Sequence, residues 1–133
     1  MIERITGANG SGKTALMVKR AEEVMKNSDG TVVFIDSSDS LNYVLPKGIR
    51  LINAKDFDIY GAKALYGFIS GICAGNYDIS DIFIDTTLKI IWNNTTDMDD
   101  FTSLLSELSR TAKVDFHIAY CDSYSPELTQ ENY

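Results

Sequence analysis

Residues 7–14 read Gly-Ala-Asn-Gly-Ser-Gly-Lys-Thr and match the spacing G-x-x-x-x-G-K-[ST] of a phosphate-binding loop, or P-loop. In this pattern the glycines let the backbone turn tightly, so that successive backbone N–H groups point at an anion. The spacing assigns the β- and γ-phosphates to Lys13 and an Mg²⁺ ion to the Thr14 hydroxyl. The stretch therefore predicts a nucleotide-binding loop made of Gly7, Ala8, Asn9, Gly10, Ser11, Gly12, Lys13 and Thr14.

The segments on either side of this stretch fit the context that a P-loop requires. Ile2–Thr6 predicts a short strand that enters the loop. Thr14–Asn27 predicts a helix that leaves it, because apolar side chains recur along one stripe: Met17, Val18, Ala21, Val24 and Met25. The strand–loop–helix order favours a phosphate-binding loop over a glycine-rich turn before an ordinary helix.

Beyond residue 30 the chain alternates between apolar strand-like runs and helix-like segments. Strands are predicted at Thr31–Ile35, Ile49–Asn53, Ile82–Asp85 and Val114–Tyr120. Helices are predicted at Ile59–Ala74, capped by Asp56 or Asp58, and from a Thr96–Asp99 capping box to Ala112. The apolar stripe of the last helix comprises Phe101, Leu104, Leu105, Leu108 and Ala112. This alternation predicts an α/β fold, a three-layer α/β/α arrangement around a mainly parallel sheet of about five strands.

Length and charge limit the range of functions. With 133 residues, the chain is expected to form a single domain over residues 1–133, with a polar tail at residues 121–133. The net charge is −7, whereas a protein that binds nucleic acid by itself usually carries a basic face. We therefore expect a nucleotide as the ligand and no autonomous nucleic-acid binding.

Cysteine usage and hydropathy bear on the compartment. Cys73 and Cys121 lie far apart in the sequence and are expected to be small buried hydrophobes in a reducing environment. The single histidine and the absence of a C-x-x-C spacing give no metal-site signature. No apolar run is long enough to span a membrane and no signal peptide is recognisable, so the sequence predicts a cytoplasmic protein.

Polar residues follow the predicted strands where they end. In a parallel sheet these carboxyl ends meet at one edge, which is where ligands bind. Besides the P-loop, that edge is expected to hold Asp36–Ser40, Asp85–Thr87 and Cys121–Asp122. Asp85 ends an apolar strand and is predicted to hold Mg²⁺, usually through water, together with Thr14. The alternative is that Asp85 only caps a helix or closes a loop.

These features resemble the P-loop NTPases, and within them the RecA-like and translocase-type ATPases, which have an extra strand between the strands of the Walker A and Walker B motifs. The resemblance rests on Gly7–Thr14, on Ile82–Asp85, and on Leu108–Lys113 leading into Phe116–Ala119. It implies binding of ATP and Mg²⁺. In that family a polar sensor residue often follows the next strand, and the matching region here, Tyr120–Ser123, lacks a clear Gln, Thr or Asn.

One further departure concerns hydrolysis. Many of these ATPases carry a Glu directly after the Walker-B Asp, whereas this chain has Thr86. A threonine hydroxyl can orient a water but cannot accept its proton as a carboxylate does. Asp36, Asp39 or Asp122 are candidates to supply that carboxylate from the same edge. The sequence thus supports nucleotide binding more strongly than hydrolysis, with Lys13, Asp85 and Thr86 as the candidate catalytic residues.

Three other residues have both a functional and a structural interpretation. Arg110 is either an arginine finger across a subunit interface or a solvated residue near a helix C-terminus, and the second is favoured. His117 is more simply a packed strand residue than a catalytic base, and Trp92 is more simply a core residue than a partner contact.

The sequence leaves three functions open. The first is an ATPase that is weak or stimulated by a partner, either a second copy of the chain or another protein. The second is a regulatory module that binds a nucleotide without hydrolysing it. The third, a small-molecule kinase, ranks last. Such enzymes usually bring an arginine-rich lid over the phosphates, whereas the arginines of this chain are widely separated: Arg4, Arg20, Arg50 and Arg110.

Overall fold

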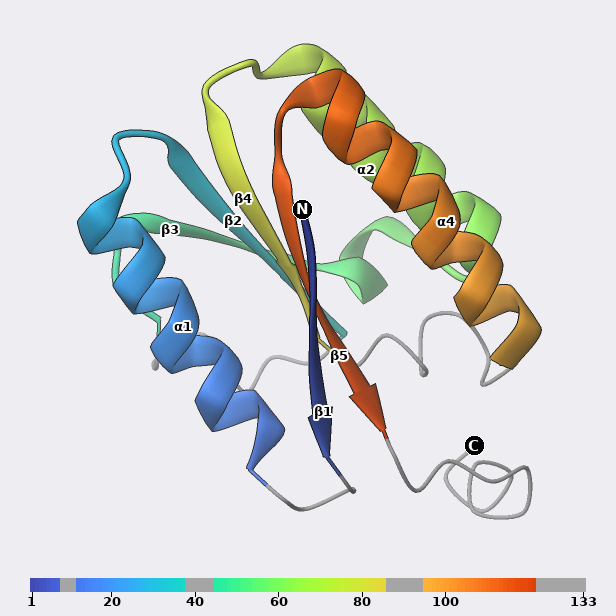
Figure 1. Cartoon of the computed structure of the whole chain (residues 1–133), viewed down its shortest axis with the longest axis horizontal. Coiled ribbons are helices and arrows are strands. Elements are labelled where there is room, and N and C mark those ends of the chain that lie inside the picture. Colours follow the sequence, from blue (N-terminus) through green and yellow to red (C-terminus); the bar gives the residue numbers. More distant parts are fainter. Residues whose placement is uncertain (8–11, 38–44, 86–94, 122–133) are drawn as a thin grey trace.

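The computed structural model describes residues 1–7, 12–37, 45–85 and 95–121, and five parallel strands form its centre (Figure 1). The strands are β1 (Ile2–Gly7), β2 (Thr31–Asp36), β3 (Ile49–Asn53), β4 (Ile79–Ile84) and β5 (Asp115–Cys121). The helices are α1 (Lys13–Asn27), α2 (Ala62–Gly75) and α4 (Thr95–Ala112), with a short 3₁₀ helix, η1 (Ala54–Phe57), after β3.

The lateral order of the strands is β1-β5-β4-β2-β3, and every pairing is parallel. The last strand, β5, therefore lies between β1 and β4, with Gly7 paired to Cys121 and Ile84 paired to Ile118. The predicted peripheral strand, β3, is an edge strand. The extra strand that the family resemblance implied between the P-loop strand and the Asp85 strand is thus present.

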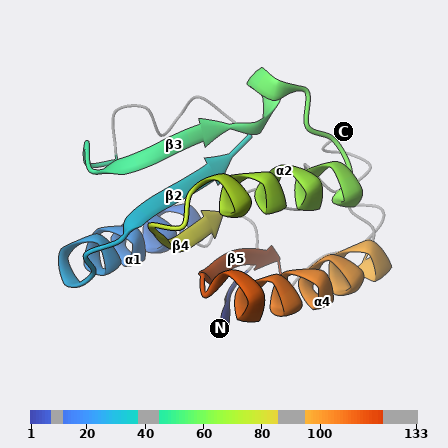
Figure 2. The same ribbon diagram turned by 90° about the horizontal axis from the view of Figure 1, so that it is seen from above.

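Two layers of helix cover the two faces of the sheet (Figures 1 and 2). Helix α1 packs on one face through Met17, Val18 and Ala21, which join Phe34 and Phe83 in one apolar cluster. Helices α2 and α4 cover the other face through Leu65, Ile69, Phe101 and Leu105, among others. Because the central strands are covered on both faces, they carry apolar side chains in continuous runs rather than in alternation. The predicted three-layer α/β/α fold is confirmed.

The prediction for the start of α2 was wrong. The helix begins at Ala62 rather than Ile59, and neither Asp56 nor Asp58 caps it. Asp58 instead closes η1 in a left-handed conformation with φ 53°, and Gly61 precedes the helix with φ 89°. Ile59 is buried and its N–H donates to the Ala54 carbonyl. Residues 54–61 therefore form the turn that leads from the edge strand β3 into α2.

Smaller differences appear in the second half of the chain. Strand β4 begins at Ile79, three residues before the prediction, because Thr31 of β2 offers it a pairing partner. Helix α4 begins at Thr95, so Thr96 lies inside its first turn and is not the residue before it. Leu104 is 40% exposed, because the buried line of α4 runs through Met98, Phe101, Leu105 and Ser109. Among the described residues, none of the helices is long and apolar enough to cross a membrane.

Candidate functional site

The carboxyl edge of the sheet gathers the residues that the sequence assigned to a nucleotide. Gly7 ends β1, Asp36 ends β2 and Asp85 directly follows β4. The Asp85 N–H donates to the Ile35 carbonyl at 2.9 Å, which holds the ends of β2 and β4 together. Residues 8–11, 38–44, 86–94 and 122–133 lie outside the described part of the chain. The predicted roles of Ala8, Asn9, Gly10, Ser11, Thr86, Asp39, Trp92 and Asp122 therefore stay predictions.

The N-terminus of α1 points to this edge. Gly12 precedes the helix in a left-handed conformation with φ 88°, and this N-cap position supplies no side-chain capping hydrogen bond. A Cβ atom at Gly12 would meet no atom within 4 Å, so the backbone angle rather than space calls for glycine. No acidic residue occupies the first turn. The first N–H groups of α1 and its positive dipole end are consequently suited to an anion.

Thr14 and Asp85 meet across this edge. The Thr14 hydroxyl donates to the Asp85 carboxylate, with 2.9 Å between Oγ1 and Oδ2, although the residues are 71 positions apart. Asp85 is 4% exposed, whereas Thr14 lies at the surface. One residue is held by the first turn of α1 and the other by the end of β4. The structure thus brings together the two residues that the sequence assigned to Mg²⁺.

These two side chains fit an Mg²⁺ ion in their chemistry. Both present oxygen, and Mg²⁺ in nucleotide sites usually takes one or two protein oxygens and completes its shell with water and phosphate. Within residues 1–7, 12–37, 45–85 and 95–121, no group of three His, Cys, Asp or Glu side chains is arranged to hold a metal. Lys13 is half-buried as the first residue of α1, directly before Thr14.

A second carboxylate, Asp36, lies next to Asp85. Ile35 pairs with Ile84, so Asp36, the last residue of β2, lies at the same level as Asp85, which follows β4. Asp36 is 1% exposed, and its Oδ1 accepts a hydrogen bond from the Ser37 N–H at 2.8 Å. Ile35 faces the α2 side, so strand alternation turns Asp36 to the α1 side, where Thr14 lies. Of the three carboxylates that the sequence offered as substitutes, Asp36 is the one whose position the structure describes.

His117 lies away from this edge and has partners that sequence reasoning missed. It is 1% exposed, with Nδ1 at 2.5 Å from Glu3 Oε1 and Nε2 at 2.7 Å from Asp81 Oδ2. Glu3 of β1 pairs directly with His117 of β5, and Asp81 lies on β4 two residues before Phe83, the β4 residue that pairs with His117. Only the strand order therefore reveals these contacts. Both ring nitrogens are engaged, which agrees with the structural interpretation of His117.

Arg110 is exposed in the last turn of α4, before β5 begins at the opposite edge of the sheet.

Comparisons with known proteins support the fold. No family model and no curated protein matches the sequence. Among solved structures, the chain is similar to flagellar accessory protein FlaH from Methanocaldococcus jannaschii, with a TM-score of 0.61 and 14% sequence identity. The match covers 98% of this chain and 65% of that protein. Together with the parallel sheet, this similarity supports the three-layer α/β/α fold.

Proposed function

We propose that this chain binds a nucleoside triphosphate, most simply ATP, together with Mg²⁺ at the carboxyl edge of its sheet. The observation that carries the proposal is the Thr14–Asp85 hydrogen bond, because the two residues come from the two separate motifs that a P-loop NTPase uses for Mg²⁺. The uncapped N-terminus of α1 behind Gly12 adds backbone donors for the phosphates. Mg²⁺, when bound, neutralises charge on the β- and γ-phosphate oxygens.

Each residue has its own part in this proposal. Gly7 to Gly12 form the loop around the phosphates, and Lys13 faces the β- and γ-phosphates. The Thr14 hydroxyl and the Asp85 carboxylate would hold the Mg²⁺ ion, Asp85 usually through water. Thr86, or the buried Asp36 beside Asp85, orients the attacking water. Because Thr86 stands where many of these ATPases carry a Glu, and its hydroxyl cannot accept the proton of the water, we propose slow hydrolysis that a second copy or a protein partner stimulates.

The alternative is a regulatory module that binds the nucleotide at the same site without hydrolysing it. The two functions differ only in whether the bound nucleotide is turned over. A small-molecule kinase gains no support from the described arginines. Arg20, for example, is engaged by Glu3 and Glu23, with N–O distances of 3.1 Å in each pair. The similarity to a flagellar accessory protein is compatible with a protein that works through partners, and the cytoplasmic location stays a prediction.

The test is a binding titration of ATP, GTP and ADP by calorimetry, with and without Mg²⁺. Lys13→Ala should abolish measurable binding, whereas Lys19→Ala, an exposed lysine on the same helix, should leave it unchanged. Asp85→Asn should weaken binding mainly in the presence of Mg²⁺, because it removes charge and keeps shape. Unchanged affinity in Lys13→Ala would overturn the proposal, and equal losses in Asp85→Asn with and without Mg²⁺ would show that Asp85 is structural.

A further inference from the structure

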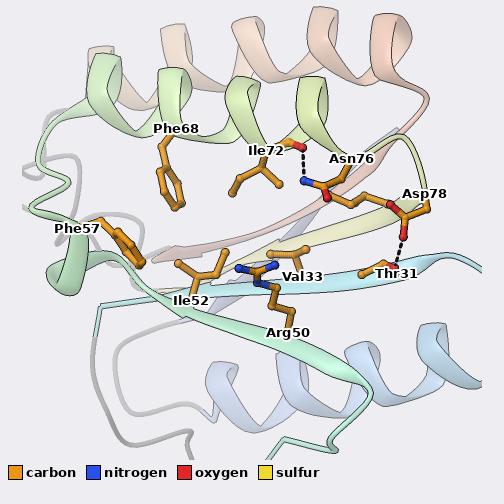
Figure 3. Close-up of a pocket in the computed structure, with 10 residues that line it drawn as sticks. Thr31, Val33, Arg50, Ile52, Phe57, Phe68, Ile72, Asn76 and Asp78 are labelled. Carbon is orange, nitrogen blue, oxygen red and sulfur yellow. Dashed lines mark hydrogen bonds between the residues drawn. The ribbon is translucent and has the colours of Figure 1, made fainter.

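A groove lies on the opposite face of the sheet from α1, between the edge strand β3 and helix α2 (Figure 3). Its volume is about 390 Å³, which is within the range of small-ligand pockets, roughly 300–1,000 Å³. Apolar side chains from β2, β3, β4, η1 and α2 form its walls, and they include Val33, Ile52, Phe68 and Ile72. The groove is separate from the proposed nucleotide site.

The groove exists because α2 does not cover the edge of the sheet completely. The helix buries Leu65, Ile69 and Cys73 toward α4 and the central strands. Phe68 and Ile72, on its flank toward β3, remain only half-buried. Phe57 of η1 closes one end, with its ring centroid 5.8 Å from that of Phe68, and is itself 60% exposed. An apolar group bound in the groove would remove these side-chain surfaces from contact with water.

Arg50 of β3 places a positive charge in this groove, at a position where the alternation of the strand predicts an apolar residue. Along β3, Ile49 and Leu51 face α1 and Ile52 faces α2. The alternation of a strand therefore places Arg50 on the α2 side, and it pairs directly with Val33 of β2. Figure 3 shows its guanidinium directed from β3 into the groove. Arg50 is exposed, and among the described residues it has no hydrogen-bond or ion-pair partner.

The unpartnered state of Arg50 is informative because the chain is strongly acidic. It carries 19 Asp and Glu residues against 12 Lys and Arg residues, so carboxylate partners are abundant. The acidic residue among those that line the groove, Asp78, is instead engaged by Thr31, whose hydroxyl donates to it at 2.7 Å. The groove thus combines an available planar guanidinium with apolar and aromatic walls.

We propose that this groove is a second ligand site, and that it binds a small organic anion with an aromatic or branched apolar body. The carboxylate, sulfonate or phosphate group of the ligand pairs with Arg50, because a guanidinium matches such groups with two parallel N–H donors. The apolar body lies against Ile52, Phe68 and Ile72 and covers the exposed ring of Phe57. Charge complementarity selects the anion, and the size of the groove selects a small molecule.

The test uses a pair of fluorescent probes that differ in charge. 8-Anilinonaphthalene-1-sulfonate carries an anionic group, and N-phenyl-1-naphthylamine has the same ring system without it. We expect saturable one-site binding of the anionic probe to the folded chain. Arg50→Gln should weaken its binding about tenfold, the loss typical of a charge-assisted hydrogen bond, and leave the neutral probe within twofold. Phe68→Leu should weaken binding of both probes.

Two controls separate this site from the rest of the molecule. Arg110→Gln, which changes an exposed arginine on α4, should leave both probes unaffected. Saturating ATP and Mg²⁺ should not displace the anionic probe, and amide chemical-shift changes on its addition should centre on β3 and the β3-facing side of α2. Binding that does not saturate, equal affinity in Arg50→Gln, displacement by ATP, or shifts centred on α1 would each overturn the proposal.

Discussion

The sharpest stability prediction concerns the two carboxylates that flank His117. Each ring nitrogen of His117 contacts one carboxylate oxygen, that of Glu3 at Nδ1 and that of Asp81 at Nε2. The ring also stacks on Phe83, with the centroids 4.1 Å apart and the planes at 10°. The cluster joins β1, β5 and β4 through Glu3, His117 and Asp81. We predict that its two halves contribute very unequally to the free energy of unfolding.

The difference follows from exposure. The side chain of Asp81 is 9% exposed and that of Glu3 is 30% exposed and paired with Arg20. Asp81→Asn removes the charge from a buried hydrogen bond, a loss of about 1.5–3 kcal/mol. Glu3→Gln acts where water can replace the contact, so its loss should stay below about 1 kcal/mol. With a urea m-value of about 2 kcal/mol/M, Asp81→Asn should lower the midpoint by roughly 1 M.

The assay is urea unfolding at pH 7, followed by circular dichroism and by tryptophan fluorescence. Asp100→Asn, an exposed position on α4, is the control and should not move the midpoint. A double-mutant cycle of Asp81→Asn with His117→Gln should yield a coupling energy of at least about 1 kcal/mol. A larger loss of stability in Glu3→Gln than in Asp81→Asn, or a coupling energy near zero, would contradict this prediction.

Three further predictions concern pH, the glycine before α1, and turnover. Burial raises the pKa of Glu3, but its contacts with His117 and Arg20 outweigh burial and hold the pKa below its usual 4.5. The stability that wild type has over Glu3→Gln should therefore be full above about pH 5 and disappear as the pH falls through the lowered pKa, as urea midpoints between pH 3 and 7 would reveal. Gly12→Ala should lower the thermal midpoint by the equivalent of about 1 kcal/mol because of its φ of 88°, whereas Gly67→Ala, inside α2 with open space around it, should raise it slightly. The purified chain should release phosphate from ATP well below about 1 per second, and Thr86→Glu should raise the rate if Asp85 acts as a Walker-B residue; turnover above that rate, absent in Lys13→Ala, would show that another residue already supplies the base.

Much of the fold could be predicted because its signals are local. Three signals act over short stretches of chain: the strand–loop–helix order around residues 7–14, the β-branched run before Asp36, and the alternation of strands with helices. These signals were enough to predict a parallel three-layer fold. The start of α2 escaped prediction, since a positive φ at Gly61 and a left-handed Asp58 depend on how the chain returns from the edge strand.

The sequence by itself determined which residues have the chemistry for phosphate and Mg²⁺, because glycine, lysine, threonine and aspartate at fixed spacing act through local backbone geometry. Only the tertiary structure decided which distant residues meet. The placement of β5 between β1 and β4 sets the partners of His117, and the ends of α1 and β4 bring Thr14 to Asp85. Likewise, the edge position of β3 makes Arg50 part of a groove. Lateral strand order depends on the burial of whole faces and on the crossover connections, and neither is encoded in any short window of residues.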